Sequence, residues 1–131
     1  MRKFGFLGLG AMAIIALAGP ASAAGDAEAG KAAFAKCGIC HQIGPDAQIV
    51  VGPPLTGVVG RKAASYPGFT YSPGMKTLGE EGHVWTPEHI DAFIADPKKL
   101  LPDSTMSLAF QGVPDAAERA NIIAYLQTFS N

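Results

Sequence analysis

The chain contains two cysteines, and both belong to one pentapeptide, Cys37-Gly38-Ile39-Cys40-His41. This C-x-x-C-H pattern is the attachment signature of a c-type haem. Two thiols three positions apart can each add to one of the porphyrin's two vinyl groups. The adjacent imidazole then lies at bonding distance from the iron. The motif predicts one covalently bound haem c, held by Cys37 and Cys40, with His41 as an iron ligand.

The first 23 residues have the pattern of an export signal. A basic start, Met1-Arg2-Lys3, precedes an apolar run from Phe4 to Ala18, and Ala21-Ser22-Ala23 supplies the small residues that signal peptidase reads. The run is shorter than the roughly 20 residues that span a bilayer, although an uncleaved membrane anchor is the alternative. We expect cleavage after Ala23, no stable membrane insertion, a periplasmic location, and a single domain over residues 24–131.

The charge balance of the chain excludes one class of partner. Removing Arg2 and Lys3 with the signal leaves eight of the ten basic residues against all 11 acidic ones, a formal charge of −3. No basic stripe is present, so we expect no nucleic-acid binding. A chain of this size buries only a modest core, which a cofactor packed at its centre would enlarge.

Other chemistries that use paired cysteines fit this sequence less well. A thioredoxin-like motif needs a strand before the cysteines and a βαβ context, and neither is predicted. A zinc site needs four ligands, whereas residues 24–131 offer two cysteines with His41, His83 and His89. An iron–sulfur cluster normally needs four cysteines. A structural disulfide is feasible in an exported protein, but it leaves His41 and the long loops unexplained.

The periodicity of apolar residues predicts an all-α fold. Gly30, Ala33, Phe34 and Cys37 share one helical face after Asp26, a plausible N-cap. No segment alternates as a strand does. The long loops of residues 42–72 make sense if they wrap a large apolar group. We therefore expect a small fold of three main helices and long loops around one haem, with helices at about 27–36, 87–95 and 115–129 and a minor turn at Ser72-Pro73.

The second axial ligand is less constrained by the sequence than the first. Residues 24–131 contain two methionines, Met75 and Met106. Met106 ends the stretch from Pro102, which we predict to be non-helical, and a methionine on such a loop can be aimed at the iron. Ligation by histidine and methionine is a known electron-transfer arrangement. His83 and His89 are the alternatives, although a loop residue and a solvated helix residue are the simpler interpretations.

Over residues 24–131 the sequence resembles the class I cytochromes c, close to the mitochondrial type and its soluble bacterial counterparts. Many segments of the resemblance keep their order and nearly their spacing. These segments are Cys37–His41, Gly52-Pro53-Pro54-Leu55, Gly57 to Lys62, Pro67-Gly68-Phe69-Thr70-Tyr71, Trp85, Asp96-Pro97-Lys98-Lys99, Met106, and Ile122 to Leu126.

The resemblance implies a role for each matching position. It makes His41 the proximal iron ligand and Met106 the distal one. The Pro53 carbonyl would accept the ring N–H of His41 and fix its tautomer. Three further residues match positions that hydrogen-bond a haem propionate: Arg61, Tyr71 and Trp85. The first helix would cross the last one where Gly30 and Phe34 meet Tyr125.

The sequence also departs from the mitochondrial pattern. Phe93 stands where many members have a tyrosine that reaches the methionine sulfur, and Met75 takes a position often held by asparagine. Thr105 replaces a lysine just before the distal ligand. About three extra residues precede Trp85 and about two follow Met106, which points to a bacterial form.

The resemblance implies one-electron transfer without an enzymatic substrate site. The expected partners are redox proteins, such as a membrane cytochrome complex, an oxidase or a reaction centre, and we expect a monomer. Lys98-Lys99 is a short charged run, so electrostatic steering should be weak. A peroxide-binding haem enzyme is the main alternative, and firm coordination by Met106 would exclude it. A subunit of a larger complex is a third interpretation.

Overall fold

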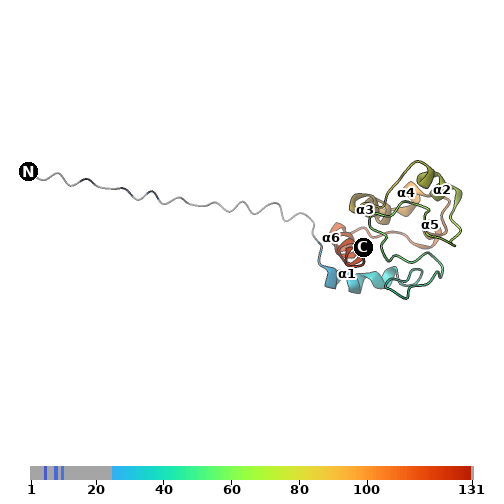
Figure 1. The fold of residues 1–131 in the computed structure, drawn as a ribbon, viewed down its shortest axis with the longest axis horizontal. Coiled ribbons are helices and arrows are strands. Elements are labelled where there is room, and N and C mark those ends of the chain that lie inside the picture. The colour runs from blue at the N-terminus through green and yellow to red at the C-terminus, as the bar shows by residue number, and fades with distance from the viewer. Residues whose placement is uncertain (1–4, 6–7, 9, 11–24, 131) are drawn as a thin grey trace, which may run out of the picture.

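The computed structural model describes residues 5, 8, 10 and 25–130. The expected cleavage site after Ala23 lies outside these residues, as does the export signal apart from three glycines. Every regular element of the described part is helical, as the sequence predicts (Figure 1). The elements are α1 (Ala27–Ala33), the 3-10 turn η1 (Phe34–Lys36), α2 (Pro73–Glu80), α3 (Pro87–Ala95), α4 (Pro97–Leu100), α5 (Thr105–Ala109) and α6 (Ala116–Gln127).

The three main helices begin at side-chain caps. Asp26 accepts a hydrogen bond from the Glu28 amide at 2.9 Å, and Thr86 accepts one from the His89 amide at 3.1 Å. Asp115 caps α6 in the same way. Each cap satisfies an amide that has no partner inside its helix. The predicted helix starts are therefore confirmed, while α6 ends two residues before the predicted Phe129.

Two predictions about the shorter elements need correction. An element does begin at Ser72-Pro73 with Ser72 capping the Met75 amide, as predicted, but it is a complete helix, α2, and not a minor turn. The stretch that ends at Met106 is also not free of helix, because α5 begins at Thr105. Pro102 constrains mainly the residue before it. Ser104 has the extended backbone of an N-cap, so a new helical turn can start three residues after the proline.

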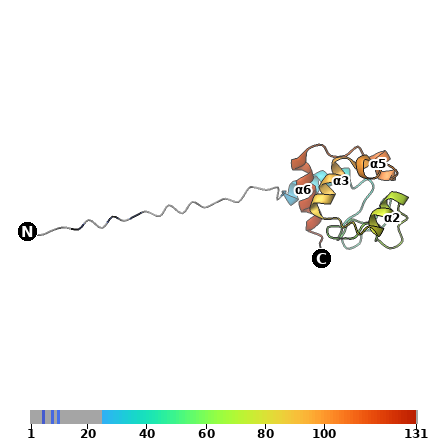
Figure 2. The same ribbon diagram turned by 90° about the horizontal axis from the view of Figure 1, so that it is seen from above.

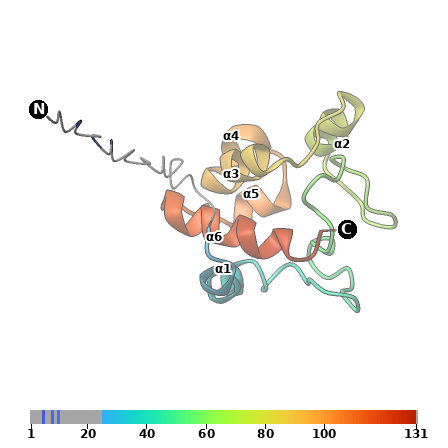
Figure 3. The same ribbon diagram turned by 60° about the vertical axis from the view of Figure 1, so that its left-hand side comes forward.

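The crossing of α1 and α6 closes one end of the fold (Figure 3). A Cβ on Gly30 would overlap the carbonyl oxygen of Asn121, so only glycine allows the two backbones to come this close. Next to this contact, Phe34 and Tyr125 meet edge to face with ring centroids 5.4 Å apart. The predicted packing of the first helix on the last is thus present.

The remaining elements stand around a central space. In Figure 2, α3 runs beside α6, while α5 and α2 lie on different sides of the molecule's far end. An isolated antiparallel bridge between Lys62 and Val84 joins the long loop to the segment before α3. Three of the most buried core side chains, Leu101, Val113 and Ile122, belong to the α4–α6 half of the chain, and Ala63 of the long loop is buried to the same degree.

Candidate haem site

A cavity of about 570 Å³ occupies the space between the helices and the long loops. This volume lies within the range of cofactor sites in proteins. Its walls are mainly apolar and include the core residues Ile90, Phe93, Ile122 and Leu126. All eight residues to which the sequence assigns a role in binding the haem or its iron line this one cavity: Cys37, Cys40, His41, Pro53, Arg61, Tyr71, Trp85 and Met106.

The two thiols of the C-x-x-C-H motif stand at the end of the first helical segment. Backbone hydrogen bonds from the Cys40 and His41 amides to the Cys37 carbonyl, at 3.1 and 2.9 Å, form the tight turn that carries them. The thiols are not joined in a disulfide. Burial raises the pKa of Cys37 to about 11, with Lys36 opposing the shift. A redox-active thiol pair of the thioredoxin kind needs a depressed pKa, so this environment disfavours that alternative.

His41 has one ring nitrogen fixed and the other available. Its Nδ1 lies 2.7 Å from the Pro53 carbonyl oxygen, as the resemblance implies. Because that oxygen can only accept, Nδ1 carries the proton and Nε2 keeps its lone pair. Burial lowers the pKa of His41 from its usual value, against the effect of the Pro53 hydrogen bond, so the ring is neutral at pH 7.

Gly52 has a part in this arrangement that was not predicted from the sequence. A Cβ at this position would collide with the His41 ring, whose Nδ1 would lie only 2.8 Å away. The Gly52 amide also donates to the Cys40 carbonyl at 2.7 Å, which holds the loop against the motif. The signal available in the sequence was the glycine directly before Pro53.

Both candidate methionines line the cavity. Met75 belongs to α2 and Met106 to α5, and each is partly buried against the core. His83 and His89 do not line it. Their rings stack on each other, with centroids 4.2 Å apart, and the His83 ring contacts Trp85. The structure therefore brings a thioether, and not either of these imidazoles, into the same space as His41.

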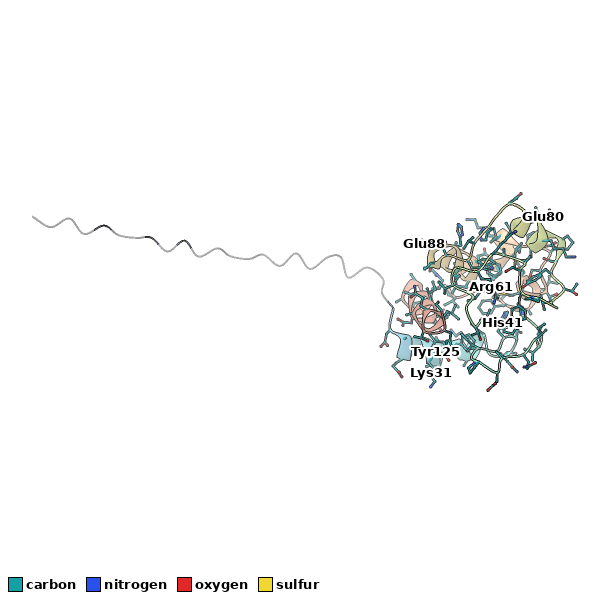
Figure 4. All side chains as sticks on the ribbon, viewed as in Figure 1. Lys31, His41, Arg61, Glu80, Glu88 and Tyr125 are labelled. Carbon is teal, nitrogen blue, oxygen red and sulfur yellow. The ribbon has the colours of Figure 1, made fainter. Side chains whose placement is uncertain are left out.

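Arg61, Tyr71 and Trp85 form a polar corner of the cavity. The Arg61 guanidinium donates to the carbonyl oxygens of Pro54 and Thr56, at 3.1 and 3.4 Å, and forms no salt bridge with a described carboxylate. Tyr71 accepts a hydrogen bond from the Tyr66 amide at 3.1 Å. Figure 4 shows His41 and Arg61 within the body of the fold, while Lys31, Glu80 and Glu88 lie at its rim.

The donor set fits a haem. Two thiols, an imidazole nitrogen and a thioether can bind a porphyrin and its iron, and apolar walls suit the macrocycle. A half-buried guanidinium without a carboxylate partner suits the acidic propionates. Zinc is fitted less well, because no three His, Cys, Asp or Glu side chains gather at one point among the described residues.

Comparison with known proteins gives several close relatives. Cytochrome c2 iso-1 of Rhodospirillum centenum is 46% identical over 118 residues, which is 82% of this chain and 98% of the relative. Cytochrome c2 of Agrobacterium tumefaciens (strain II Chrys) is 46% identical over 102 residues, 78% of this chain and 90% of that protein. The solved structure of cytochrome c2 from Rhodospirillum centenum has a TM-score of 0.72 at 43% identity, covering 82% and 100% of the two chains. No model of a known protein family matches the chain.

The helical fold around a single cavity and the C-x-x-C-H motif define a c-type cytochrome. The chain belongs to the cytochrome c2 family of class I cytochromes c. It binds one haem c covalently and transfers single electrons between redox partners, and it is an electron carrier and not an enzyme. Among the described residues no helix has the length and apolar character needed to cross a membrane.

Proposed function

We propose that Cys37 and Cys40 hold the haem through thioethers and that His41 and Met106 are its two axial iron ligands. The observation that carries this proposal is the hydrogen bond between His41 Nδ1 and the Pro53 carbonyl, in the cavity that both thiols line. It leaves Nε2 as the nitrogen available to the iron. When bound, the haem supplies one iron centre that gains and loses a single electron.

The residues of the chain set the conditions for that exchange. The Pro53 carbonyl holds the His41 ring in one tautomer and increases its basicity. The Met106 thioether is a soft donor that favours the reduced metal and so raises the potential. Arg61 supplies positive charge for the propionates, and Tyr71 and Trp85 have side chains able to donate hydrogen bonds beside it. With His41 and Met106 both holding the iron, the chain would leave no open site for a substrate.

The ferric absorption band near the red end of the visible spectrum tests the axial assignment, because it arises from the methionine–iron bond. In Met106→Ala the band should disappear and the protein should bind added cyanide or imidazole. Met75→Ala is the matched control, because both methionines are partly buried in the same cavity. It should keep the band. Loss of the band in Met75→Ala alone would reverse the assignment.

The location and partners follow from the same reasoning. We infer that residues 1–23 are removed on export and that the monomeric domain works in the periplasm, without stable membrane insertion and without nucleic acid. A membrane cytochrome complex, an oxidase or a reaction centre would be its partner. Lys36 is paired with Glu118 at 2.5 Å. The other exposed lysines of the described residues are spread along the chain and not gathered on one element: Lys31, Lys62, Lys76, and Lys98 and Lys99 of α4. Association should therefore depend only weakly on salt.

A further inference from the structure

Met106 sits on a short element with few restraints of its own. Helix α5 has five residues, and its N-cap, Ser104, forms no side-chain capping hydrogen bond. The preceding loop, residues 101–104, links α5 to α4 and is anchored at one end by Leu101, which is 2% exposed. Such a short helix has little stability alone. The position of Met106 therefore depends on what holds this loop.

Asp103 ties the loop to a distant segment of the chain. Its Oδ2 accepts a hydrogen bond from the Gly74 amide at 2.9 Å. Gly74 is the second residue of α2, where backbone amides have no partner within the helix. Pro73 has no amide hydrogen and Ser72 takes the Met75 amide, so Asp103 completes the cap. A carboxylate is also favoured at this end by the helix dipole.

The approach is so close that a side chain at position 74 would displace the Asp103 carboxylate. A Cβ built there would lie 2.6 Å from Asp103 Oδ1 and 3.2 Å from its Cγ. An alanine would therefore push the carboxylate away from the amide. Two substitutions, one at each end, can thus remove the same contact, and only one of them changes the charge.

The contact joins two walls of the cavity that otherwise lie apart. In Figure 2, α2 and α5 are on different sides of the far end of the molecule. Among the described residues, it is the one hydrogen bond between segments 72–82 and 97–110. Ser72, Met75, Asp103 and Met106 all line the cavity. The Asp103–Gly74 hydrogen bond therefore links two segments of the cavity wall, residues 72–82 and 97–110.

We propose that Asp103 is a positioning residue that restrains the Met106 loop by tying it to α2. This tie sets how readily an added ligand displaces Met106 from ferric iron. The inference rests on the proposed role of Met106 as an axial ligand. Asp103 itself does not contact the haem in this proposal. It acts by restraining the loop that carries Met106.

Imidazole binding to the ferric holoprotein tests this proposal. Breaking a hydrogen bond to an exposed carboxylate should raise the apparent imidazole affinity about three- to tenfold in Asp103→Ala, and similarly in Gly74→Ala. Asp103→Asn keeps an acceptor oxygen and should stay close to the parent protein. Asp46→Ala removes the same charge from another exposed position and should have no effect.

Urea unfolding of the same variants separates this role from a purely structural one. If Asp103→Ala lowers the unfolding midpoint but leaves imidazole affinity unchanged, the positioning role is overturned. Equal imidazole affinities in Asp103→Ala and Asp46→Ala would also overturn the positioning role. Failure of the axial assignment gives a different result, because the red band would then survive Met106→Ala whatever Asp103 does.

Discussion

His83 carries a ring nitrogen, Nε2, that is buried without a hydrogen-bond partner among the described residues. One face of the ring stacks on His89, and its edge meets Trp85 with centroids 4.9 Å apart. Protonation would place a second N–H where nothing accepts it, beside another imidazole. Burial accordingly lowers the pKa of His83 from its usual 6.5, and His89 adds to the shift.

This lowered pKa predicts a pH dependence of stability. As the pH falls through about 6.5, His83 becomes protonated in the unfolded chain, whereas in the folded chain its lower pKa keeps it neutral. The contribution of neutral His83 to the free energy of unfolding should therefore be present at pH 7.5 and partly lost at pH 5.5. Urea unfolding of the holoprotein at these two values, compared with His83→Phe, measures it. The variant keeps the aromatic stack and should lose part of the decrease, whereas equal decreases would refute the idea.

Single-residue features differ in how far the sequence could predict them. The hydrogen bond of His41 to Pro53 was predicted through the family resemblance, in which the C-x-x-C-H motif and Gly52-Pro53 keep nearly their usual spacing. The stacking of His83 on His89 could not be foreseen. It depends on the left-handed turn at Gly82, with φ of 81°, and on where α3 begins.

At the scale of elements, the crossing of α1 and α6 brings the two ends of the described chain together. Asn121 contributes twice, since its side-chain oxygen accepts from the Asp26 amide at 2.8 Å and its backbone lies against Gly30. The neighbouring Phe34–Tyr125 contact continues into Phe129, whose ring meets Tyr125 at 5.3 Å. This crossing positions the segment that leads directly into Cys37.

Gly30→Ala should separate the two helices and destabilise the protein. Alanine improves helix propensity by about 1 kcal/mol. The added Cβ overlaps backbone atoms of Asn121, which cannot move aside as a side chain could. We expect a net loss of about 1–3 kcal/mol in the free energy of unfolding, measured with urea. The exposed Lys31→Ala in the same helix is the control, and equal stability of Gly30→Ala and the parent protein would contradict this account.

Helix starts were more predictable than short helices. Three capping residues mark the helix starts: Asp26, Thr86 and Asp115. Each side chain bonds an amide two or three residues later, so the contact can be predicted from neighbouring residues alone. Helix α5 has no such bond, and four or five residues hold too little periodicity to be recognised. Its existence depends on packing of Met106 and the fully buried Ser107.

At the scale of the whole molecule, the cavity dominates the energetics. Unfilled volume in a core costs about 24 cal/mol per Å³, so 570 Å³ corresponds to on the order of 10 kcal/mol. The opening to solvent makes this an upper bound. It is comparable with the whole stability of a small domain, about 5–15 kcal/mol. We therefore expect the chain to depend on the haem for folding.

Cys37→Ala/Cys40→Ala should yield a largely unfolded chain. Without thioethers the haem is held only by its axial ligands and is easily lost, and the loops then have no apolar group to cover. Far-ultraviolet circular dichroism of the purified variant measures the remaining helix. A stable, haem-free protein with the helix content of the parent would contradict the prediction.

The overall architecture was predictable because one motif determines what the chain encloses. The motif of Cys37, Cys40 and His41 specifies a haem, and the long loops are then explained because they cover it. The cross-cavity contacts were not predictable. Asp103 and Gly74 are 29 residues apart, and only the folded chain brings them within hydrogen-bonding distance.

The central claim is that the chain fills both axial positions of its haem and acts as a closed electron carrier. Addition of carbon monoxide to the reduced protein at neutral pH, followed by optical absorption, tests it most directly. Met106 is a soft ligand that ferrous iron retains, so the reduced spectrum should not change, while Met106→Ala should convert to the carbon monoxide form. Ready conversion of the parent protein would show an open axial position and contradict the account.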